Sequence, residues 1–205
     1  VDVPAGQAVK TNAVASIDPL SFLVGRVQVN FVDQAKPSTL MNTSRLIDRL
    51  VKKVRSATGE LTWNWGQGLV TVDSPKAQGI TGFLAEMGAQ RTKDVGFDIR
   101  VPYGSVVLVS MDGQPISKSK RMLLQVASEE RAYGWNAPGG TRRTIQGVGT
   151  TPINAKQFQG TVQILRGTKA LRVTPLDLNG MPKAPKKVTG KIALSPDVLY
   201  YMVER

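Results

Sequence analysis

After Arg55 the sequence consists of short apolar or alternating runs that turn residues interrupt about every ten positions. Residues 96–101 (GFDIRV) show the pattern, with three apolar side chains alternating with two charged ones. Successive side chains of a strand point to opposite faces, so alternation of this kind is typical of a half-buried strand. Many such strands can bury their apolar faces only by stacking one sheet on another, which favours a β-sandwich.

Turn residues between these runs predict how the strands connect. LTWNW and LVTVD flank GQG at 66–68, and SVVLVSM leads into Asp112-Gly113 and then MLLQVAS. TVQILR and ALRVTPL bracket Gly167-Thr168 in the same way. Glycine and the Asp-Gly dipeptide favour tight turns, so we expect hairpins at all three places.

Two corners resemble each other. LVSMDGQPISK (108–118) and VTPLDLNGMPK (173–183) both continue from a strand through Asp to a Gly and then a Pro. Asp177 and Asn179 of the second corner are interpreted as turn formers whose side chains bond the local backbone.

The first quarter of the chain carries different patterns. GRVQVNF (25–31) alternates like a strand, whereas residues 43–55 place apolar side chains at helical spacing with a basic opposite face. The small, polar residues 1–19 are typical of an arm or linker. We therefore predict a mainly β protein, an antiparallel, jelly-roll-like β-sandwich over residues 20–205 with one short amphipathic helix and an N-terminal arm at 1–19.

Composition restricts the chemistry. The 205 residues include no cysteine and no histidine, which excludes disulfides, thiolate chemistry and a Ser-His-Asp triad built within the chain. Glycoside hydrolysis would need two carboxyl groups about 5–9.5 Å apart across a cleft, yet Glu60, Asp73, Glu129 and Glu130 show no local pattern of that kind. We predict that this segment is not an enzyme and holds no cofactor and no metal.

The charge suggests the kind of partner. A formal net charge of +12 favours an anionic partner, although a basic surface that is merely solvated is an equal alternative. No run approaches the roughly 20 apolar residues of a membrane span, so no membrane partner is expected. No signal peptide is visible, and because the chain begins at Val1 rather than Met, we expect it to be a processed product or part of a longer protein.

Aromatic residues mark two candidate binding sites. Trp63 and Trp65 would share one face of a strand, about 6–7 Å apart, where they could stack on sugar rings or nucleobases, or be buried in the core. Residues 130–143 (ERAYGWNAPGGTRR) combine aromatic and basic side chains in a turn-rich loop. The candidate carbohydrate-binding residues are Trp65, Trp63, Tyr133, Trp135, Arg131, Arg142 and Arg143. The lysine-rich stretch 169–191 has few aromatics and is interpreted as solvated charge.

Two longer segments carry a family resemblance. One runs Asp73, Ser74, Pro75, Ala77, Gln78, Gly79, Gly82 and Phe83; the other runs Ser110, Met111, Asp112, Gly113, Pro115, Ile116, Ser119, Lys120 and Arg121. With the closing VLYYMVER, they resemble the C-terminal β-sandwich accessory domain of large bacterial glycoside hydrolases, over roughly residues 20–205. The matching positions look structural rather than catalytic.

The resemblance implies an extracellular or periplasmic bacterial module that accompanies a polysaccharide-degrading catalytic domain, expected upstream in the parent chain. We expect a non-catalytic, carbohydrate-binding role with a preference for acidic or sulfated glycans. The alternatives are a nucleic-acid-binding β domain, for which no recognition signature is present, and a purely structural spacer.

Overall fold

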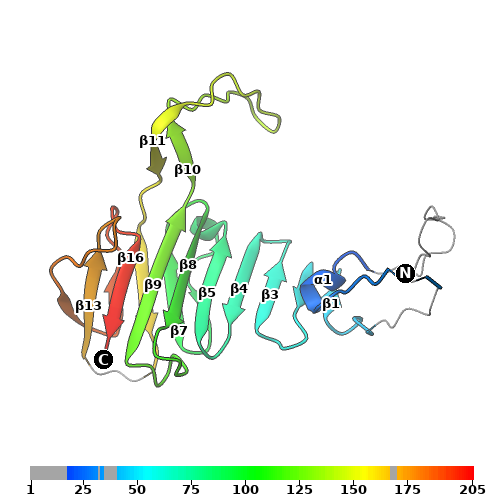
Figure 1. The fold of residues 1–205 in the computed structure, drawn as a ribbon, viewed down its shortest axis with the longest axis horizontal. Helices are drawn as coiled ribbons and strands as arrows, with labels where there is room; N and C mark the ends of the chain where they lie inside the picture. The colour runs from blue at the N-terminus through cyan, green and yellow to red at the C-terminus, as the bar shows by residue number, and fades with distance from the viewer. Residues whose placement is uncertain (1–17, 32, 35–40, 167–169) are drawn as a thin grey trace. The chain divides into compact units, whose positions relative to one another are not determined.

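The structure, a computed structural model, describes residues 18–31, 33–34, 41–166 and 170–205. The chain divides into two compact units, Val1–Gly66 and Gln67–Arg205 (Figure 1). Of the predicted N-terminal arm, all but Asp18 and Pro19 lies outside the described residues.

The second unit contains a large antiparallel sheet. Its strands are, in spatial order, β4 (Leu69–Asp73), β5 (Ala77–Gly82), β8 (Gly104–Ser110), β9 (Arg121–Ser128), β16 (Tyr200–Glu204), β13 (Ala170–Leu176) and β14 (Lys186–Thr189). The C-terminal strand β16 therefore pairs between β9 and β13, strands from two distant parts of the sequence (Figure 1).

A smaller sheet belongs to the same unit. Its strands are, in order, β15 (Lys191–Ala193), β12 (Gly160–Ile164), β7 (Val95–Ile99) and β6 (Gln90–Arg91), and the short 3-10 helix η2 (Leu84–Glu86) precedes β6. Its neighbouring strands are also antiparallel. The predicted mainly β, antiparallel sandwich is confirmed.

The core contains apolar side chains from both sheets. Strands β8 and β9 alternate buried and more exposed residues, although their sequences contain the continuous apolar runs VVLV (106–109) and MLL (122–124). The buried cluster includes Val106, Leu108, Met122 and Leu124 from the large sheet and Phe97, Ile99, Val162 and Ile164 from the small one. Burial of these faces is the main force that holds the sheets together.

One polar group lies inside this core and joins the sheets. The Gln78 side chain of β5 is fully buried; its amide nitrogen donates to Asp94 Oδ2 at 2.9 Å and to the Ser74 carbonyl at 3.3 Å. Its oxygen accepts from Thr92 Oγ1 at 2.8 Å and from the Asp94 backbone N–H at 2.9 Å. Because Thr92 and Asp94 precede β7, these bonds link the large sheet to the small one.

Both predicted corners are held by an aspartate. Asp112 accepts hydrogen bonds from the backbone N–H groups of Gln114 and Lys120 and from the hydroxyls of Ser110 and Ser119. Asp177 accepts from the backbone N–H groups of residues 179 and 181. The prediction that Asp177 bonds the local backbone is confirmed, whereas no such bond from the Asn179 side chain is seen among the described residues.

The predicted connections are only partly right. Strands β8 and β9 pair antiparallel, as expected, but residues 111–120 form a long corner between them rather than a two-residue turn. The hairpin predicted across 167–168 is wrong, because β12 lies in the small sheet and β13 in the large one. Residues 167–169 themselves lie outside the described part.

The described residues of the first unit form the helix α1 (Ser21–Val24) and three short strands, β1 (Ile47–Asp48), β2 (Lys53–Arg55) and β3 (Leu61–Asn64). Strand β2 pairs antiparallel with both β1 and β3, and its central residue Val54 lies between Ile47 and Trp63. Val24 and Val54 are the buried apolar residues of the described part of this unit.

The helix predicted over 43–55 is wrong, and these residues form the β1–β2 hairpin instead. The Asp48 side chain accepts hydrogen bonds from the backbone N–H groups of Leu50 and Val51, which fixes the turn. Leu50 is 96% exposed, so the apolar face of a helix would have had little to contact. An amphipathic helix gains most of its stability from such contact.

The strand predicted over 25–31 is also wrong. Residues 26–31 belong to no strand and are exposed. Phe31 in particular is 87% exposed. A segment of alternating residues becomes part of a sheet only when a neighbouring strand pairs with it. The described residues contain no such strand next to 25–31.

Candidate functional site

A two-stranded, exposed arm extends from the second unit. We call residues 129–156 the arm; it contains β10 (Glu130–Tyr133) and β11 (Thr150–Ala155), which pair antiparallel. Figure 1 shows it extending beyond the end of β9. At its base the Lys156 N–H donates to the Glu129 carbonyl at 3.0 Å, and the Ser128 hydroxyl donates to the Lys156 carbonyl.

The outer half of the arm is ordered by backbone bonds rather than by a core. Asn136 N–H donates to the Gly147 carbonyl at 3.0 Å, and the N–H groups of Gln146 and Gly147 donate back to the Asn136 carbonyl. Gly149 has a φ of +71°, and a Cβ there would lie 2.5 Å from the Tyr133 carbonyl oxygen. A glycine is required at this position because the chain returns so close to β10.

Five of the predicted site residues lie on this arm. Arg131 and Tyr133 are on β10, and Trp135, Arg142 and Arg143 follow in the loop. Tyr133 is 65% exposed, Arg142 and Arg143 are exposed, and Trp135 is half-buried. None of these residues is buried in the core, so the loop does not plug the end of the sandwich with its tryptophan.

The charges of the arm are unevenly paired. Glu129 Oε1 lies 3.8 Å from Arg131 Nη2, and its Oε2 lies 3.4 Å from Lys156 Nζ. Arg142 and Arg143 form no ion pair with any carboxylate in the described part of the chain. Two guanidinium groups at the end of the arm are therefore available to an anionic ligand.

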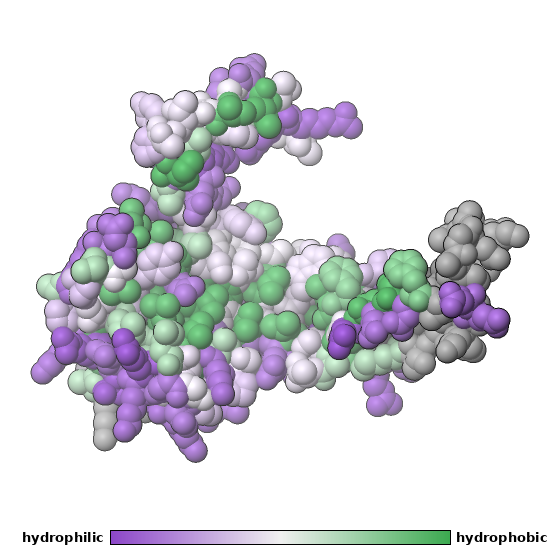
Figure 2. Space-filling model, in the orientation of Figure 1, coloured by the Kyte–Doolittle hydropathy of each residue, from purple (hydrophilic) through white to green (hydrophobic). Residues whose placement is uncertain are grey.

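The arm also exposes aliphatic side chains. Ile145 is 58% exposed, Val148 69% and Ile153 60%. Figure 2 shows hydrophobic and hydrophilic groups together on the arm. These three aliphatic residues follow no pattern in the sequence, unlike the aromatic and basic residues of 130–143.

The two remaining candidates lie in the first unit. The rings of Trp63 and Trp65 have centroids 5.6 Å apart and an interplanar angle of 48°. Both residues are half-buried, so the pair is neither a fully exposed platform nor a buried core element. Tilted rings do not present one common plane, which suits a flat ligand less well than coplanar rings would.

The acidic residues considered for catalysis have partners of another kind. Asp73 accepts the backbone N–H of Lys93 at 3.1 Å, and Glu129 forms the two ion pairs of the arm. Among the described residues there is no cluster of three or more acidic side chains that could hold a metal ion. No helix in the described ranges is long and apolar enough to cross a membrane.

The second unit carries a second basic surface that no sequence pattern predicts. An open depression of about 620 Å³, here called the basic groove, is lined by Lys120, Arg121, Ala170, Leu171, Arg172, Lys187, Glu204 and Arg205. Five of these side chains are basic and one is acidic. Figure 2 shows hydrophilic side chains gathered over this end of the large sheet, beside a more apolar central face.

The basic groove was overlooked because its residues are far apart in the sequence. Arg172 and Lys187 fall within the stretch that was interpreted as solvated charge, and Arg121 lies in a motif that looked structural. Only the register of four strands brings them together.

Known proteins supply no identity for this arrangement. No protein-family model matches the chain, and no curated protein and no solved structure gives a significant match.

Proposed function

We propose that this chain is a non-catalytic accessory module of a polysaccharide-degrading glycoside hydrolase and that it binds acidic glycans through the arm. The observation that carries the proposal is the arm itself. It places an exposed tyrosine and two unpaired arginines on a surface that is held away from the core. The two sequence segments that resemble such accessory domains support the context, as does the net charge of +12.

The chemistry of these side chains suits an acidic sugar polymer. The guanidinium group of Arg142 or Arg143 can form two parallel hydrogen bonds with a carboxylate or sulfate. The faces of Tyr133 and Trp135 can contact the apolar face of a sugar ring while their polar atoms stay in solvent. Since the structure puts all four on one arm, a single glycan chain could meet charge and ring contacts together.

A second function is favoured by the exposed aliphatic residues of the arm. Ile145, Val148 and Ile153 offer nothing to a charged sugar, whereas apolar side chains on a surface commonly mark contacts with protein. In this alternative the module is a structural spacer whose arm docks onto a neighbouring domain, and glycan binding is absent.

Affinity electrophoresis and calorimetry with a set of polysaccharides distinguish the glycan-binding role from the spacer role. The set should contain dextran sulfate, polygalacturonate and neutral dextran. The wild-type chain is expected to bind the two anionic polymers and to ignore dextran. The arm variant Tyr133→Ala/Arg142→Gln/Arg143→Gln should lose about tenfold or more in affinity, because it removes one ring and two charge-assisted contacts.

A charge-matched control keeps this experiment specific. Arg91→Gln/Arg100→Gln removes two exposed arginines, one at the end of β6 and one directly after β7, which are remote in sequence from the arm. An equal loss of affinity in both variants would mean that the effect depends only on the net charge of the chain. Wild-type chain that binds no polysaccharide, charged or neutral, would overturn glycan binding and leave the spacer role.

A further inference from the structure

We propose that the basic groove is a second glycan-binding site, which takes successive sulfate or carboxylate groups along an acidic polysaccharide. The inference rests on the proposed function for its class of ligand, but its residues are separate from those of the arm. It assigns a role to an outer sheet surface that has no part in the core.

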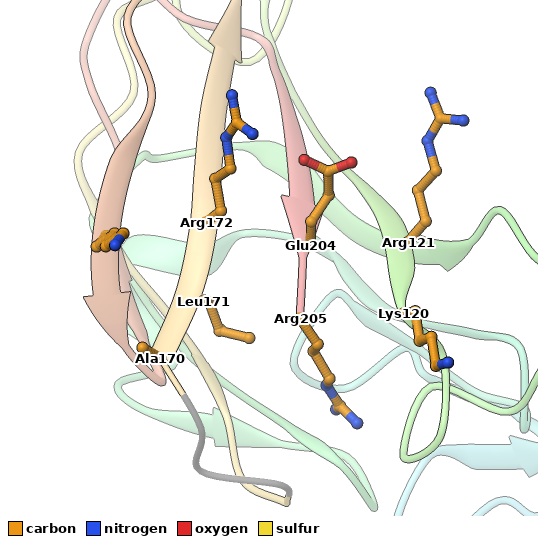
Figure 3. Close-up of a pocket in the computed structure, with 8 residues that line it drawn as sticks. Lys120, Arg121, Ala170, Leu171, Arg172, Glu204 and Arg205 are labelled. Atoms are coloured by element: carbon orange, nitrogen blue, oxygen red, sulfur yellow. The ribbon is translucent and has the colours of Figure 1, made fainter.

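The first support is the arrangement of the side chains. In the strand register, Lys187 lies opposite Arg172, Arg172 opposite Glu204, and Glu204 opposite Arg121. These residues therefore form a row across β14, β13, β16 and β9. Figure 3 shows Arg172, Glu204 and Arg121 of this row. Adjacent strands lie about 4.8 Å apart, so the Cα atoms of Arg172 and Arg121 are separated by about 10 Å.

Burial confirms which way the row points. Lys187, Arg172 and Arg121 are exposed, whereas their strand neighbours Leu171 and Met122 are buried in the core. Alternation along each strand thus places apolar residues inward and the basic residues outward. The row is a regular, periodic array rather than a set of side chains on mobile loops.

The second support is that the three basic side chains of the row, and Lys120 beside it, have no internal partner. In the described part of the chain, the side chains of Lys120, Arg121, Arg172 and Lys187 form no hydrogen bond and no ion pair within 4 Å. Glu204 lies between Arg172 and Arg121 and balances only part of their charge. Like charges on neighbouring strands repel one another, and a bound anion would relieve that repulsion.

Arg205 has a different role at the same place. Its guanidinium donates to the carbonyl oxygens of Ser117, Ile116 and Arg166 at 2.6, 3.1 and 3.2 Å. These bonds connect the end of β16 to the 111–120 corner and to the segment after β12. We infer that Arg205 supports the floor of the basic groove, and that the other four cations meet the ligand.

The size and openness of the groove favour a polymer as its ligand. A depression of about 620 Å³ falls within the usual range of ligand sites. It is open on the surface, however, and several cations are spread along it instead of converging on one point (Figure 3). An extended chain with repeated anionic groups fits this arrangement better than a single small anion.

The test compares two variants that each remove two arginines and one lysine. The groove variant is Arg121→Gln/Arg172→Gln/Lys187→Gln. The control variant is Arg91→Gln/Lys93→Gln/Arg100→Gln, whose three exposed side chains lie on or beside the small sheet. Calorimetry with dextran sulfate, polygalacturonate and neutral dextran is carried out at about 150 mM salt, where long-range attraction between exposed charges is largely screened.

The groove variant is expected to lose about tenfold or more in affinity for an anionic polymer, and the control variant to lose much less. The polymer that shows the larger loss identifies sulfate or carboxylate as the preferred group. Equal affinities of the two variants for both polymers would overturn the proposal. Because the arm variant is measured separately, failure of the groove and failure of the arm give different results.

Two further measurements sharpen the result. Glu204→Gln removes the one acidic side chain of the row and should strengthen binding about two- to fivefold, the range expected for one exposed charge contact. A merely structural Glu204 would not produce tighter binding. Titration with a single-stranded oligonucleotide of matched charge is the second measurement, and binding to it that exceeds binding to both glycans would overturn the assignment to a polysaccharide.

Discussion

The sandwich of the second unit and its arm are both built from antiparallel strands, yet they differ in what surrounds them. Strands such as β9 bury every second residue against the opposite sheet, whereas all six residues of β11 are exposed. The arm keeps its shape through backbone bonds and through glycines such as Gly149. The sandwich should therefore determine whether the chain folds, and the arm should be free to serve binding.

Replacing a core aromatic should produce the largest effect. Phe158 follows the arm directly and is fully buried, so Phe158→Ala is expected to cost about 3–5 kcal/mol in the free energy of unfolding. Tyr133→Ala on the arm should change that energy by no more than about 0.5 kcal/mol. Chemical denaturation of both variants measures the contrast, and similar losses would contradict it.

Breaking the polar link between the sheets should have the next largest effect on stability. Gln78→Met keeps much of the side-chain volume but leaves Thr92 and Asp94 without their buried partners. We expect a loss of about 2–3 kcal/mol, because a buried polar group without a hydrogen bond is costly. Gln114→Met, at an exposed position, is the control; if both variants unfold alike in denaturant, Gln78 has no special role.

The corner aspartate predicts a dependence on acid. The backbone N–H of Lys120, together with the other hydrogen bonds it accepts, lowers the pKa of Asp112 below its ordinary value. An aspartate with a lowered folded-state pKa stabilises the fold above its unfolded pKa of about 3.9, and this contribution disappears as the pH falls through the folded value. Asp112→Asn should therefore lower the melting temperature at neutral pH, and the difference from wild type should shrink in acid. If the difference in melting temperature between Asp112→Asn and wild type stayed constant with pH, this explanation would be contradicted.

Removing the arm should have the smallest effect on stability. Glu130 and Ala155 are directly opposite in the arm, so an Asn-Gly turn can replace residues 131–154. The melting temperature is expected to stay within about 2 °C of wild type, which corresponds to roughly 0.5 kcal/mol for a chain of this size. The shortened chain should also lose the glycan binding that depends on the arm. Its unfolding at a much lower temperature would show that the arm stabilises the sandwich.

The sequence could predict those features of the fold that depend on residues close together in the chain, and not those that depend on distant ones. Strand β7 was predictable, because the alternation of apolar and charged residues over 96–101 reflects the two faces of a sheet directly. The helix expected over 43–55 failed since apolar spacing does not say whether a surface exists for the helix to contact. The hairpin expected across 167–168 failed since turn residues do not distinguish a hairpin from a crossing between sheets.

The same division applies to the candidate sites. The arm could be predicted as a binding surface because its aromatic and basic residues lie together within 130–143. The basic groove could not, because Arg121 and Arg172 become neighbours only when β16 pairs between β9 and β13. Register at that distance is set by the whole sandwich and by no local pattern.

The buried Gln78 has a consequence for the arm. Apolar faces tolerate small sliding of one sheet over another, but the three directed hydrogen bonds that join the Gln78 amide to Thr92 and Asp94 resist it. The arm leaves the large sheet at β9 and re-enters the chain's small sheet at β12. Sliding of one sheet over the other would therefore move the two ends of the arm, at β9 and at β12, in opposite directions. By resisting that sliding, the Gln78 amide keeps the direction of the arm constant from one molecule to the next.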